Sequence, residues 1–561
     1  MKRRGPAVAG MAALLLAALL ATACGRDTYI GEPAAPQNSE ILFTSIRFEK
    51  DRLLGRLFRQ VRGAPHIVGG VHRIQPDGSG LKVVGPRTYD AVVSPANGYV
   101  ARVQADVPDG PTDILVYTMD EQGRRHKLSL TNTPDRCETS PAWSPDGTRL
   151  AFVSWARDEE WGCSVGGLPY EGPPPGAVPV KPGAPLPTPE LGGTAALPAS
   201  GGMWLLEVLD VEGAARVTAD VPAGPSSLLW APNGKALAAI YYGPVSQTLL
   251  FSVEPDALAE TYRILESPTE LAWSPDGTAL AYAFVAFDPT GQTEATRILL
   301  DGPGGKELGR LPGRLVGRLN WSPDGSTLAF LIGTPLRGTG PVTPSELGGF
   351  EWSGSADLYL VNADGTGLRV LATSTAGLAC PAWSPDGTRI AFLEFAILPP
   401  VQSGFPMEAR PNLLSVVDVA TGEKRQADPD PTCPLAWSRG GDRIAYVGVA
   451  RSEKKERGPR EPPEEKFFWS LFVMKTDDGS VAEIADDATP QTAGLTGESR
   501  IAWSPDGGQI AFLRSPDCRH VWCPYGRLHV ASADGSRLKK LTAIPVEHIV
   551  GWVQRQPGGW P

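Results

Sequence analysis

The sequence predicts an all-β protein in which small four-stranded sheets repeat around a closed ring. The stretch Trp143-Ser144-Pro145-Asp146-Gly147, followed by the apolar run Leu150-Ala151-Phe152-Val153, recurs along the chain. Most copies start 43 to 66 residues apart, with one gap of 87. Self-similarity at such a period is typical of repeat architectures.

The recurring tryptophan marks each copy, so we expect it to be a structural residue of the repeat. The motif residues are Trp143, Trp230, Trp273, Trp321, Trp383, Trp437 and Trp503, with a weaker copy at Val93-Ser94-Pro95.

Each repeat unit reads as four antiparallel strands, A to D. Ser-Pro-Asp-Gly suits a hairpin turn, because Pro presets φ and Gly supplies a left-handed exit. A short apolar strand A precedes the turn, and the alternating strand B at 388–393 follows it. Strand C (357–361) and strand D (368–371) follow across a second turn at 363–365.

Four-stranded sheets repeated radially form the blades of a β-propeller. We expect each motif tryptophan to wedge between neighbouring blades. The chain starts with a B-type strand at 41–45 and ends with an A-type strand at 549–552. Pairing the N- and C-terminal strands closes the ring and removes both sheet edges. The count gives eight or nine blades.

The Trp-Ser-Pro-Asp-Gly turn, the Ile-Ala-Phe strand and the Leu-Tyr-Leu-Val strand together resemble the TolB-type WD-like β-propeller repeat. The resemblance covers roughly residues 41–553. The resemblance implies the fold but says almost nothing about an activity, since one fold hosts many functions.

The N-terminus resembles a bacterial lipoprotein signal. Lys2-Arg3-Arg4 is positively charged, residues 7–21 are apolar, and Ala21-Thr22-Ala23-Cys24 follows. We therefore expect a signal peptide at 1–23, a lipidated Cys24 with a flexible tether to residue 40, and the propeller at 41–561. The expected location is lipid-anchored to the cell membrane or outer membrane, periplasmic or at the cell surface. The alternative is an ordinary secretory signal cleaved nearby.

The net charge is −10 and the pI is near 5.3. Nucleic acid is not an expected partner, because phosphate binding requires a basic surface.

Long insertions fall between strands B and C, which places them on one face. The most notable are 156–203, 333–356 and 450–470, and the mixed-charge run 451–466 reads as a solvated loop. Binding residues collect on long loops of rigid scaffolds. The candidate binding residues there are the aromatics Trp155, Trp161, Phe350, Trp352, Phe467, Phe468, Trp469 and Trp522. The alternative is that many of them pack the loops onto the ring.

Six cysteines remain beside Cys24, and an even count in an exported protein suggests disulfides. Cys518 and Cys523 bracket one B–C loop. Cys137 and Cys163 flank the Trp143 hairpin, and Cys380 and Cys433 precede equivalent tryptophans of adjacent units. The alternative is free thiols.

Five of the six histidines lie in the first or last units, which ring closure brings near one another: His66, His72, His520, His529 and His548. Some propeller lyases that degrade pectic fragments use clustered histidines and a divalent metal. We do not expect an additional serine hydrolase domain, because the repeats occupy roughly residues 41–553. The turn aspartates Asp146, Asp276, Asp324, Asp386 and Asp506 read as turn formers.

The sequence therefore favours a membrane-anchored, exported lipoprotein whose β-propeller is a non-catalytic scaffold that binds an envelope protein or peptide through its long-loop face. A polysaccharide is the alternative partner. No cofactor, metal or catalytic residue is expected. One alternative is a propeller enzyme, a polysaccharide lyase or hydrolase with or without metal, acting at the central pore. Another is a structural component of a larger envelope complex.

Overall fold

The computed structural model confirms the all-β prediction, because every element among the described residues is a strand. It describes residues 39–48, 67–87, 92–94, 99–105, 111–119, 125–157, 163, 204–211, 215–241, 247–264, 268–287, 294–300, 306–335, 354–375, 377–395, 411–428, 430–433, 435–455, 464–490, 500–516 and 525–554.

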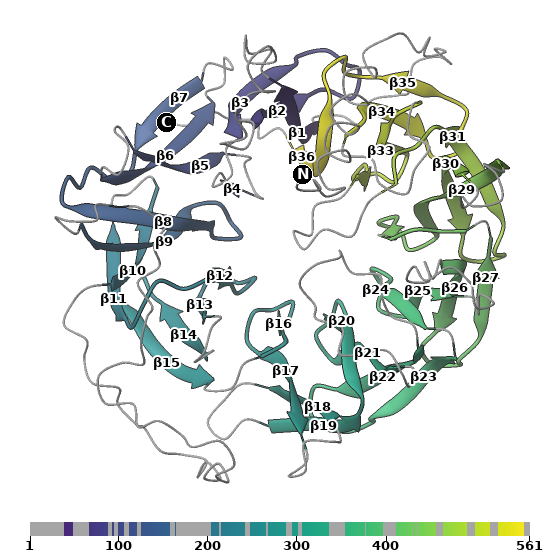
Figure 1. Cartoon of the computed structure of the whole chain (residues 1–561), viewed down its shortest axis with the longest axis horizontal. Helices are drawn as coiled ribbons and strands as arrows, with labels where there is room; N and C mark the ends of the chain where they lie inside the picture. The colour runs from purple at the N-terminus through teal and green to yellow at the C-terminus, as the bar shows by residue number, and fades with distance from the viewer. Residues whose placement is uncertain are drawn as a thin grey trace, which may run out of the picture.

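Nine four-stranded antiparallel sheets follow one another around a ring (Figure 1). Each sheet is one blade, with strand A nearest the ring axis and strand D at the outer rim. Of the eight or nine blades expected, the structure has nine.

The blades are numbered from the N-terminus, with their strands given in the order A to D. Blade 1 consists of β36 (Val546–Gln554), β1 (Ser39–Phe48), β2 (Ile67–Ile74) and β3 (Lys82–Arg87). Blade 2 consists of β4 (Val92–Val93), β5 (Val100–Ala105), β6 (Thr112–Met119) and β7 (Arg125–Ser129). Blade 3 consists of β8 (Arg136–Trp143), β9 (Arg149–Ala156), β10 (Trp204–Asp210) and β11 (Arg216–Val221).

Blade 4 consists of β12 (Ser227–Trp230), β13 (Ala236–Tyr241), β14 (Gln247–Val253) and β15 (Leu258–Ile264). Blade 5 consists of β16 (Glu270–Trp273), β17 (Leu280–Phe287), β18 (Glu294–Leu300) and β19 (Lys306–Pro312). Blade 6 consists of β20 (Arg314–Trp321), β21 (Thr327–Pro335), β22 (Gly354–Asn362) and β23 (Arg369–Ser374).

Blade 7 consists of β24 (Leu378–Trp383), β25 (Arg389–Phe395), β26 (Pro411–Asp418) and β27 (Lys424–Ala427). Blade 8 consists of β28 (Ala436–Trp437), β29 (Arg443–Lys455), β30 (Glu464–Lys475) and β31 (Val481–Asp486). Blade 9 consists of β32 (Ile501–Trp503), β33 (Gln509–Arg514), β34 (Arg527–Ser532) and β35 (Leu538–Lys540).

The two ends of the chain close the ring within blade 1, as the terminal strand fragments predicted. β1 pairs with β36 from Ser39 opposite Gln554 to Ser45 opposite Val546. Ile41 lies opposite Trp552 in this register. The first strand begins at Ser39, two residues earlier than the predicted start of the propeller.

The core lies between blades, because strand B of each blade is covered on both faces. Leu150, Ala151, Phe152 and Val153 of β9 have no exposed surface. This explains why the middle of strand B is a continuous apolar run. The alternating pattern predicted at 388–393 was wrong, since residues 390–393 all have no exposed surface. The aromatic residue nine positions after the tryptophan is buried to within 1 % in blades 3, 6, 7, 8 and 9: Phe152, Phe330, Phe392, Tyr446 and Phe512.

The motif tryptophans join neighbouring blades by a repeated hydrogen bond. Each indole Nε1 donates to a carbonyl oxygen on strand A of the preceding blade, at 2.8 to 3.3 Å. The donor and acceptor pairs are Trp143 and Val92, Trp230 and Ala142, Trp273 and Leu229, Trp321 and Ala272, Trp383 and Asn320, Trp437 and Ala382, Trp503 and Ala436, and Trp552 and Ala502.

Among the described residues, no helix is both long enough and apolar enough to span a bilayer.

Candidate binding face

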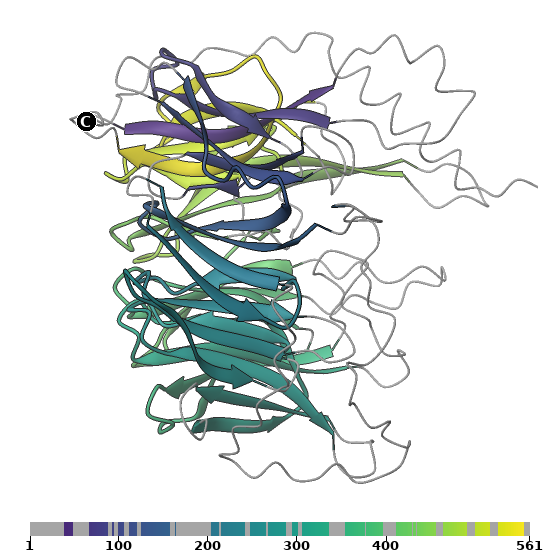
Figure 2. The same ribbon diagram turned by 90° about the vertical axis from the view of Figure 1, so that its left-hand side faces the viewer.

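The two faces of the ring differ in their connections. The described A–B and C–D turns lie on one face, here called the turn face. Strands B and D end, and strands C and A begin, at the other face, here called the loop face. In Figure 2 the described turns gather along one side of the ring, and the pale green pair β29 and β30 extends past the other strands on the opposite side. The structure thus separates a compact face from an elaborated one.

Each Ser-Pro-Asp-Gly turn uses its own carboxylate as a local acceptor. Ser274 Oγ donates to Asp276 Oδ1 at 2.6 Å, and the backbone N–H of Thr278 donates to the same oxygen at 3.1 Å. The Ser274 hydrogen bond is the largest cause that holds the pKa of Asp276 below its ordinary value. Gly277 adopts φ of 68°, the left-handed exit that the sequence predicted. The same Ser–Asp bond recurs at Asp146, Asp324, Asp386 and Asp506. These aspartates therefore act as turn formers.

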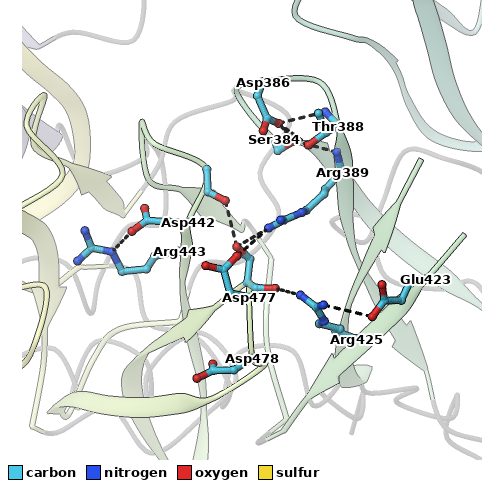
Figure 3. Close-up of polar contacts among 12 residues, drawn as sticks. Ser384, Asp386, Thr388, Arg389, Glu423, Arg425, Asp442, Arg443, Asp477 and Asp478 are labelled. Atoms are coloured by element: carbon cyan, nitrogen blue, oxygen red, sulfur yellow. Dashed lines mark hydrogen bonds and ion pairs between the residues drawn. The ribbon is translucent and has the colours of Figure 1, made fainter. Parts of the chain in front are cut away.

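Side chains on the turn face also connect neighbouring blades, as between blades 7 and 8 (Figure 3). Arg389 Nη1 donates to Thr476 Oγ1 at 2.7 Å, and that hydroxyl donates to the Gly441 carbonyl at 3.1 Å. Arg425 Nη1 donates to the Thr476 carbonyl at 2.7 Å. Thr476 is only 1 % exposed, so one buried residue receives both arginines. Side-chain hydrogen bonds on the turn face thus join blade 7 to blade 8.

At blade 3 the loop face presents a pair of stacked indoles. Trp155 lies near the end of β9, and Trp204 is the first residue of β10. Their ring centroids are 4.6 Å apart. A Cβ added at Gly224 would meet the Trp204 ring at 2.8 Å, so the ring lies directly on this backbone. Both indoles are half-buried. Trp155 was predicted as a binding residue and Trp204 was not.

A disulfide joins Cys137 to Cys163 beside this stack, with Cα atoms 5.6 Å apart, and Cys137 lies opposite Trp155 in the register. A second disulfide joins Cys380 on β24 to Cys433 just before β28, with Cα atoms 6.1 Å apart. These are two of the three pairings that the sequence suggested, and the third, between Cys518 and Cys523, lies outside the described residues. The second disulfide links blade 7 to blade 8. Two disulfides indicate a protein that folds outside the reducing cytoplasm.

A buried carboxylate lies beneath the loop face between blades 2 and 3. Glu138 is 1 % exposed, and Thr131 Oγ1 donates to its Oε2 at 2.8 Å while Thr133 Oγ1 donates to Oε1. Burial raises the pKa of Glu138 to about 7, against the opposing effect of the two threonine hydroxyls. Asp113 and Glu207 raise it further. A raised carboxylate pKa often marks a functional site, but here both oxygens are enclosed by protein donors.

Glu207 is the second buried carboxylate of this region, with no exposed surface. It accepts a hydrogen bond from Ser154 and forms an ion pair with Arg216. Arg136 donates to the same Ser154 hydroxyl at 2.8 Å. The sequence reasoning missed both Glu138 and Glu207. The detectable signal was a charged residue inside an apolar strand, as in Trp204-Leu205-Leu206-Glu207-Val208.

The most prominent described feature of the loop face is the two-stranded extension of blade 8, here called the arm (450–455 and 464–468). β29 has 13 residues and β30 has 12, and their register continues to Lys455 opposite Glu464. Residues of opposite charge face each other at Glu453 and Lys466 and at Lys454 and Glu465. The prediction of a solvated loop over 451–466 was therefore wrong for the described residues, since 451–455 and 464–466 continue strands B and C. Opposite charges at directly facing positions stabilise strand pairing. The presence of mixed charges in the sequence does not distinguish such a paired ribbon from a solvated loop.

The aromatics at the base of the arm divide between core and surface. Phe467 and Trp469 are 5 % and 4 % exposed and belong to the core between blades 8 and 9. Phe468 is half-buried, and the Arg451 guanidinium lies 3.9 Å from its ring centroid. Of these three candidate binding residues, Phe468 is the one whose side chain remains partly accessible.

Several predicted residues lie outside the described part of the chain. They are Cys24, Cys518, Cys523, Trp161, Phe350, Trp352 and Trp522.

Ring closure brings two of the predicted histidines into blade 1 but onto opposite faces of its sheet. His72 pairs with Phe43, whereas His548 pairs with Thr44, the next residue of β1. Successive residues of a strand point to opposite faces. His529 belongs to blade 9. Among the described residues, no group of three or more His, Cys, Asp or Glu side chains is arranged to hold a metal ion. His66 and His520 lie outside them.

No protein-family model matches the sequence, and no curated protein matches it. Solved structures that resemble the fold include a eukaryotic initiation factor, at 13% identity, 93% coverage of this chain, 100% of that chain and a TM-score of 0.48. An oligogalacturonate lyase from Vibrio parahaemolyticus has 14% identity, 79% and 98% coverage and a TM-score of 0.34. TolB from Acinetobacter baumannii has 14% identity, 62% and 79% coverage and a TM-score of 0.27. TolB proteins are thus among the structural neighbours, and none of these likenesses assigns an activity.

Proposed function

We propose that this chain is an exported, lipid-anchored β-propeller that binds a protein partner through its loop face and does not itself catalyse a reaction. The proposal depends most on one observation, the arm of blade 8. β29 and β30 continue as a pair beyond β28 and β31, the other two strands of the blade. A ribbon that leaves the body of the ring adds little to its core and instead presents side chains to the surroundings.

The chemistry of the arm suits recognition of another polypeptide. Arg451, Ser452 and Glu453 are exposed, and Arg451 stacks on Phe468 while it also forms an ion pair with Glu453 at 3.7 Å. Arginine and aromatic side chains are enriched among the residues that dominate the energy of protein interfaces. Exposed charges at the edges of the ribbon oppose non-specific strand addition and so favour a matched partner.

The support beneath the arm is rigid. Phe467 and Trp469 anchor its base in the core between blades 8 and 9, and the Cys380–Cys433 disulfide fixes blade 8 to blade 7. A binding site placed on a fixed scaffold loses less conformational entropy when its partner docks. The N-terminal segment before Ser39, with Cys24 at its predicted lipidation site, would keep this surface near a membrane.

A photo-crosslinking amino acid placed at Ser452 in the intact chain tests the proposal in the native cell. We expect a discrete protein adduct from Ser452 and none from Thr421, a matched exposed polar residue on the turn face. The double substitution Arg451→Ala with Phe468→Ala should remove the adduct while it leaves the folded ring intact by circular dichroism. Equal crosslinking from both faces, or none from Ser452, would contradict a binding role for the loop face.

A further inference from the structure

The ring of indole hydrogen bonds is interrupted at one of the nine blade interfaces. Strand A of blade 2 is β4, and Val93 occupies the position that tryptophan holds in the other eight blades. The valine side chain has no N–H donor and no aromatic ring to fill the space between the blades. The bond from Trp143 to Val92 joins blade 2 to blade 3, so the interface without an indole is the one between blades 1 and 2.

The apolar core at this interface is also the smallest of the nine among the described residues. Its buried members are Leu42, Val71, Val84, Val100, Leu115 and Tyr117. By comparison, the cluster between blades 8 and 9 includes fifteen buried residues. β4 itself has only two residues, so strand A contributes little packing here. Less buried apolar area means a smaller free energy of association between the two blades.

Apolar side chains at the outer rim of the same two blades remain in water. Leu81, just before β3, is 48 % exposed, Val83 on β3 is 49 % exposed, and Leu128 on β7 is 44 % exposed. These are three of the five large hydrophobic residues that are exposed among the described residues. Strands D of blades 1 and 2 therefore do not bury these side chains against each other.

The interface between blades 9 and 1, next to the paired chain ends, is more extensive. The register between β1 and β36 runs from Ser39 to Ser45, and Trp552 Nε1 donates to the Ala502 carbonyl of blade 9 at 3.0 Å. Ile41, Phe43 and Ile549 of blade 1 share a core cluster with Leu513 and Val530 of blade 9. Blade 1 is thus joined firmly to blade 9 and weakly to blade 2.

We infer that the propeller has a built-in opening point between blades 1 and 2, and that the ring separates there while the pairing of its N- and C-terminal strands stays intact. The two blades stay joined when they separate, because β3 and β4 are consecutive strands of one chain. Separation exposes the six-residue cluster of this interface and leaves the hydrogen bonds within each blade unbroken. Local opening of this kind has a lower free energy than global unfolding.

Thiol labelling of the native, full-length chain tests the inference. Val71→Cys and Val100→Cys place a thiol on either side of the opening point, and Val530→Cys and Val153→Cys place one at the closure interface and in the blade 3 and 4 core. All four valines have no exposed surface, and a cysteine is close to valine in size. The unsubstituted chain gives the background from its own cysteines.

Without denaturant, we expect a maleimide to label Val71→Cys and Val100→Cys at least tenfold faster than the two control variants. Equal rates at all four positions would mean that only global unfolding exposes the core, and they would overturn the inference. Faster labelling of Val530→Cys would also overturn it, because the closure would then open first.

A second substitution tests whether loss of the indole is what weakens an interface between blades. Trp321→Val should create a new opening point between blades 5 and 6, where Trp321 donates to the Ala272 carbonyl. In that background Val361→Cys, which is buried in the same interface, should be labelled faster than in the parent. If loss of the indole leaves this rate unchanged, the missing indole at Val93 does not explain an opening point and the inference fails.

Discussion

The indole Nε1 of Trp503 lies 2.8 Å from the carbonyl oxygen of Ala436, the residue just before the tryptophan of blade 8. The Arg443 guanidinium of blade 8 lies 5.4 Å from the centroid of the same indole. Arg149 and Trp230 repeat this second contact between blades 3 and 4, at 5.3 Å. The tryptophan therefore acts between blades rather than within one, which explains why it recurs with the period of the blade.

Replacement of Trp230 tests the energy of this contact. Trp230 is 7 % exposed and donates to the Ala142 carbonyl at 3.0 Å. We expect Trp230→Ala to lower the free energy of unfolding by about 3–5 kcal/mol, because it leaves a large cavity. Trp230→Phe keeps most of the ring and loses the N–H donor, so it should cost about 1–2 kcal/mol.

Urea unfolding measures both values. Leu128→Ala, at a residue that is 44 % exposed, is the control and should change the free energy of unfolding by less than about 0.5 kcal/mol. A loss below about 1 kcal/mol for Trp230→Ala would show that the indole does not join the blades.

Glu138 makes stability depend on pH. Its pKa is raised from 4.5 to about 7 in the folded chain. Between these two pH values the folded chain keeps a proton on Glu138 that the unfolded chain has released. The free energy of unfolding therefore falls as the pH rises from 4.5 to about 7. Glu138→Gln mimics the protonated form. At pH 8 it should raise the free energy of unfolding by about 1–3 kcal/mol, and at about pH 4 it should change it little.

Unfolding curves of the unsubstituted chain and the Glu138→Gln variant, from about pH 4 to about pH 8, check this sign. Glu453→Gln is the control, since Glu453 is exposed on the arm. If the stability of the Glu138→Gln variant still falls between pH 4.5 and 7 as steeply as that of the unsubstituted chain, the buried carboxylate is not the cause.

The fold was predictable from sequence because it follows from local, repeated chemistry. Ser274, Asp276 and Gly277 form their turn with hydrogen bonds that span only a few residues. The same Ser–Asp bond recurs in blades 3, 6, 7 and 9. The ends of the chain were predictable for a related reason. A B-type strand at Ile41 and an A-type strand at Trp552 each lacked a neighbour that the other supplied.

The candidate site was less predictable, because its contacts join residues that are far apart and do not repeat. Trp204 lies 49 positions after Trp155, and no periodic pattern relates them. The Glu138 backbone exchanges hydrogen bonds with the hydroxyl of Thr112, which lies 26 positions earlier on blade 2. The charges of the arm looked like those of a solvated loop, and only the register of β29 with β30 distinguishes the two.

Removal of the inter-blade disulfide should destabilise the ring. In the chain-entropy model, a cross-link stabilises by restricting the unfolded chain, typically by about 2–4 kcal/mol. The double substitution Cys380→Ala with Cys433→Ala should have this effect, and Cys137→Ala with Cys163→Ala a smaller one by about 0.6 kcal/mol. The reason is that the sequence separation is 53 residues in the first pair and 26 in the second. Urea unfolding of each variant, with and without reductant, gives the comparison. Unchanged stability of the first variant would argue against the bond between blades 7 and 8.

Substitution of Cys24 tests the proposed membrane anchor. If Cys24 becomes the lipid-bearing first residue, Cys24→Ala should abolish incorporation of labelled palmitate and release the chain from the membrane fraction. A single acyl chain gives only marginal membrane binding, so firm retention in that fraction requires the several chains of a lipoprotein anchor. Thr28→Ala, four residues farther on, is the matched control and should leave both labelling and membrane association unchanged. An unsubstituted chain that remains unlabelled and is recovered without membrane would indicate an ordinary secretory signal. The loop face would then act on partners in solution rather than beside a membrane.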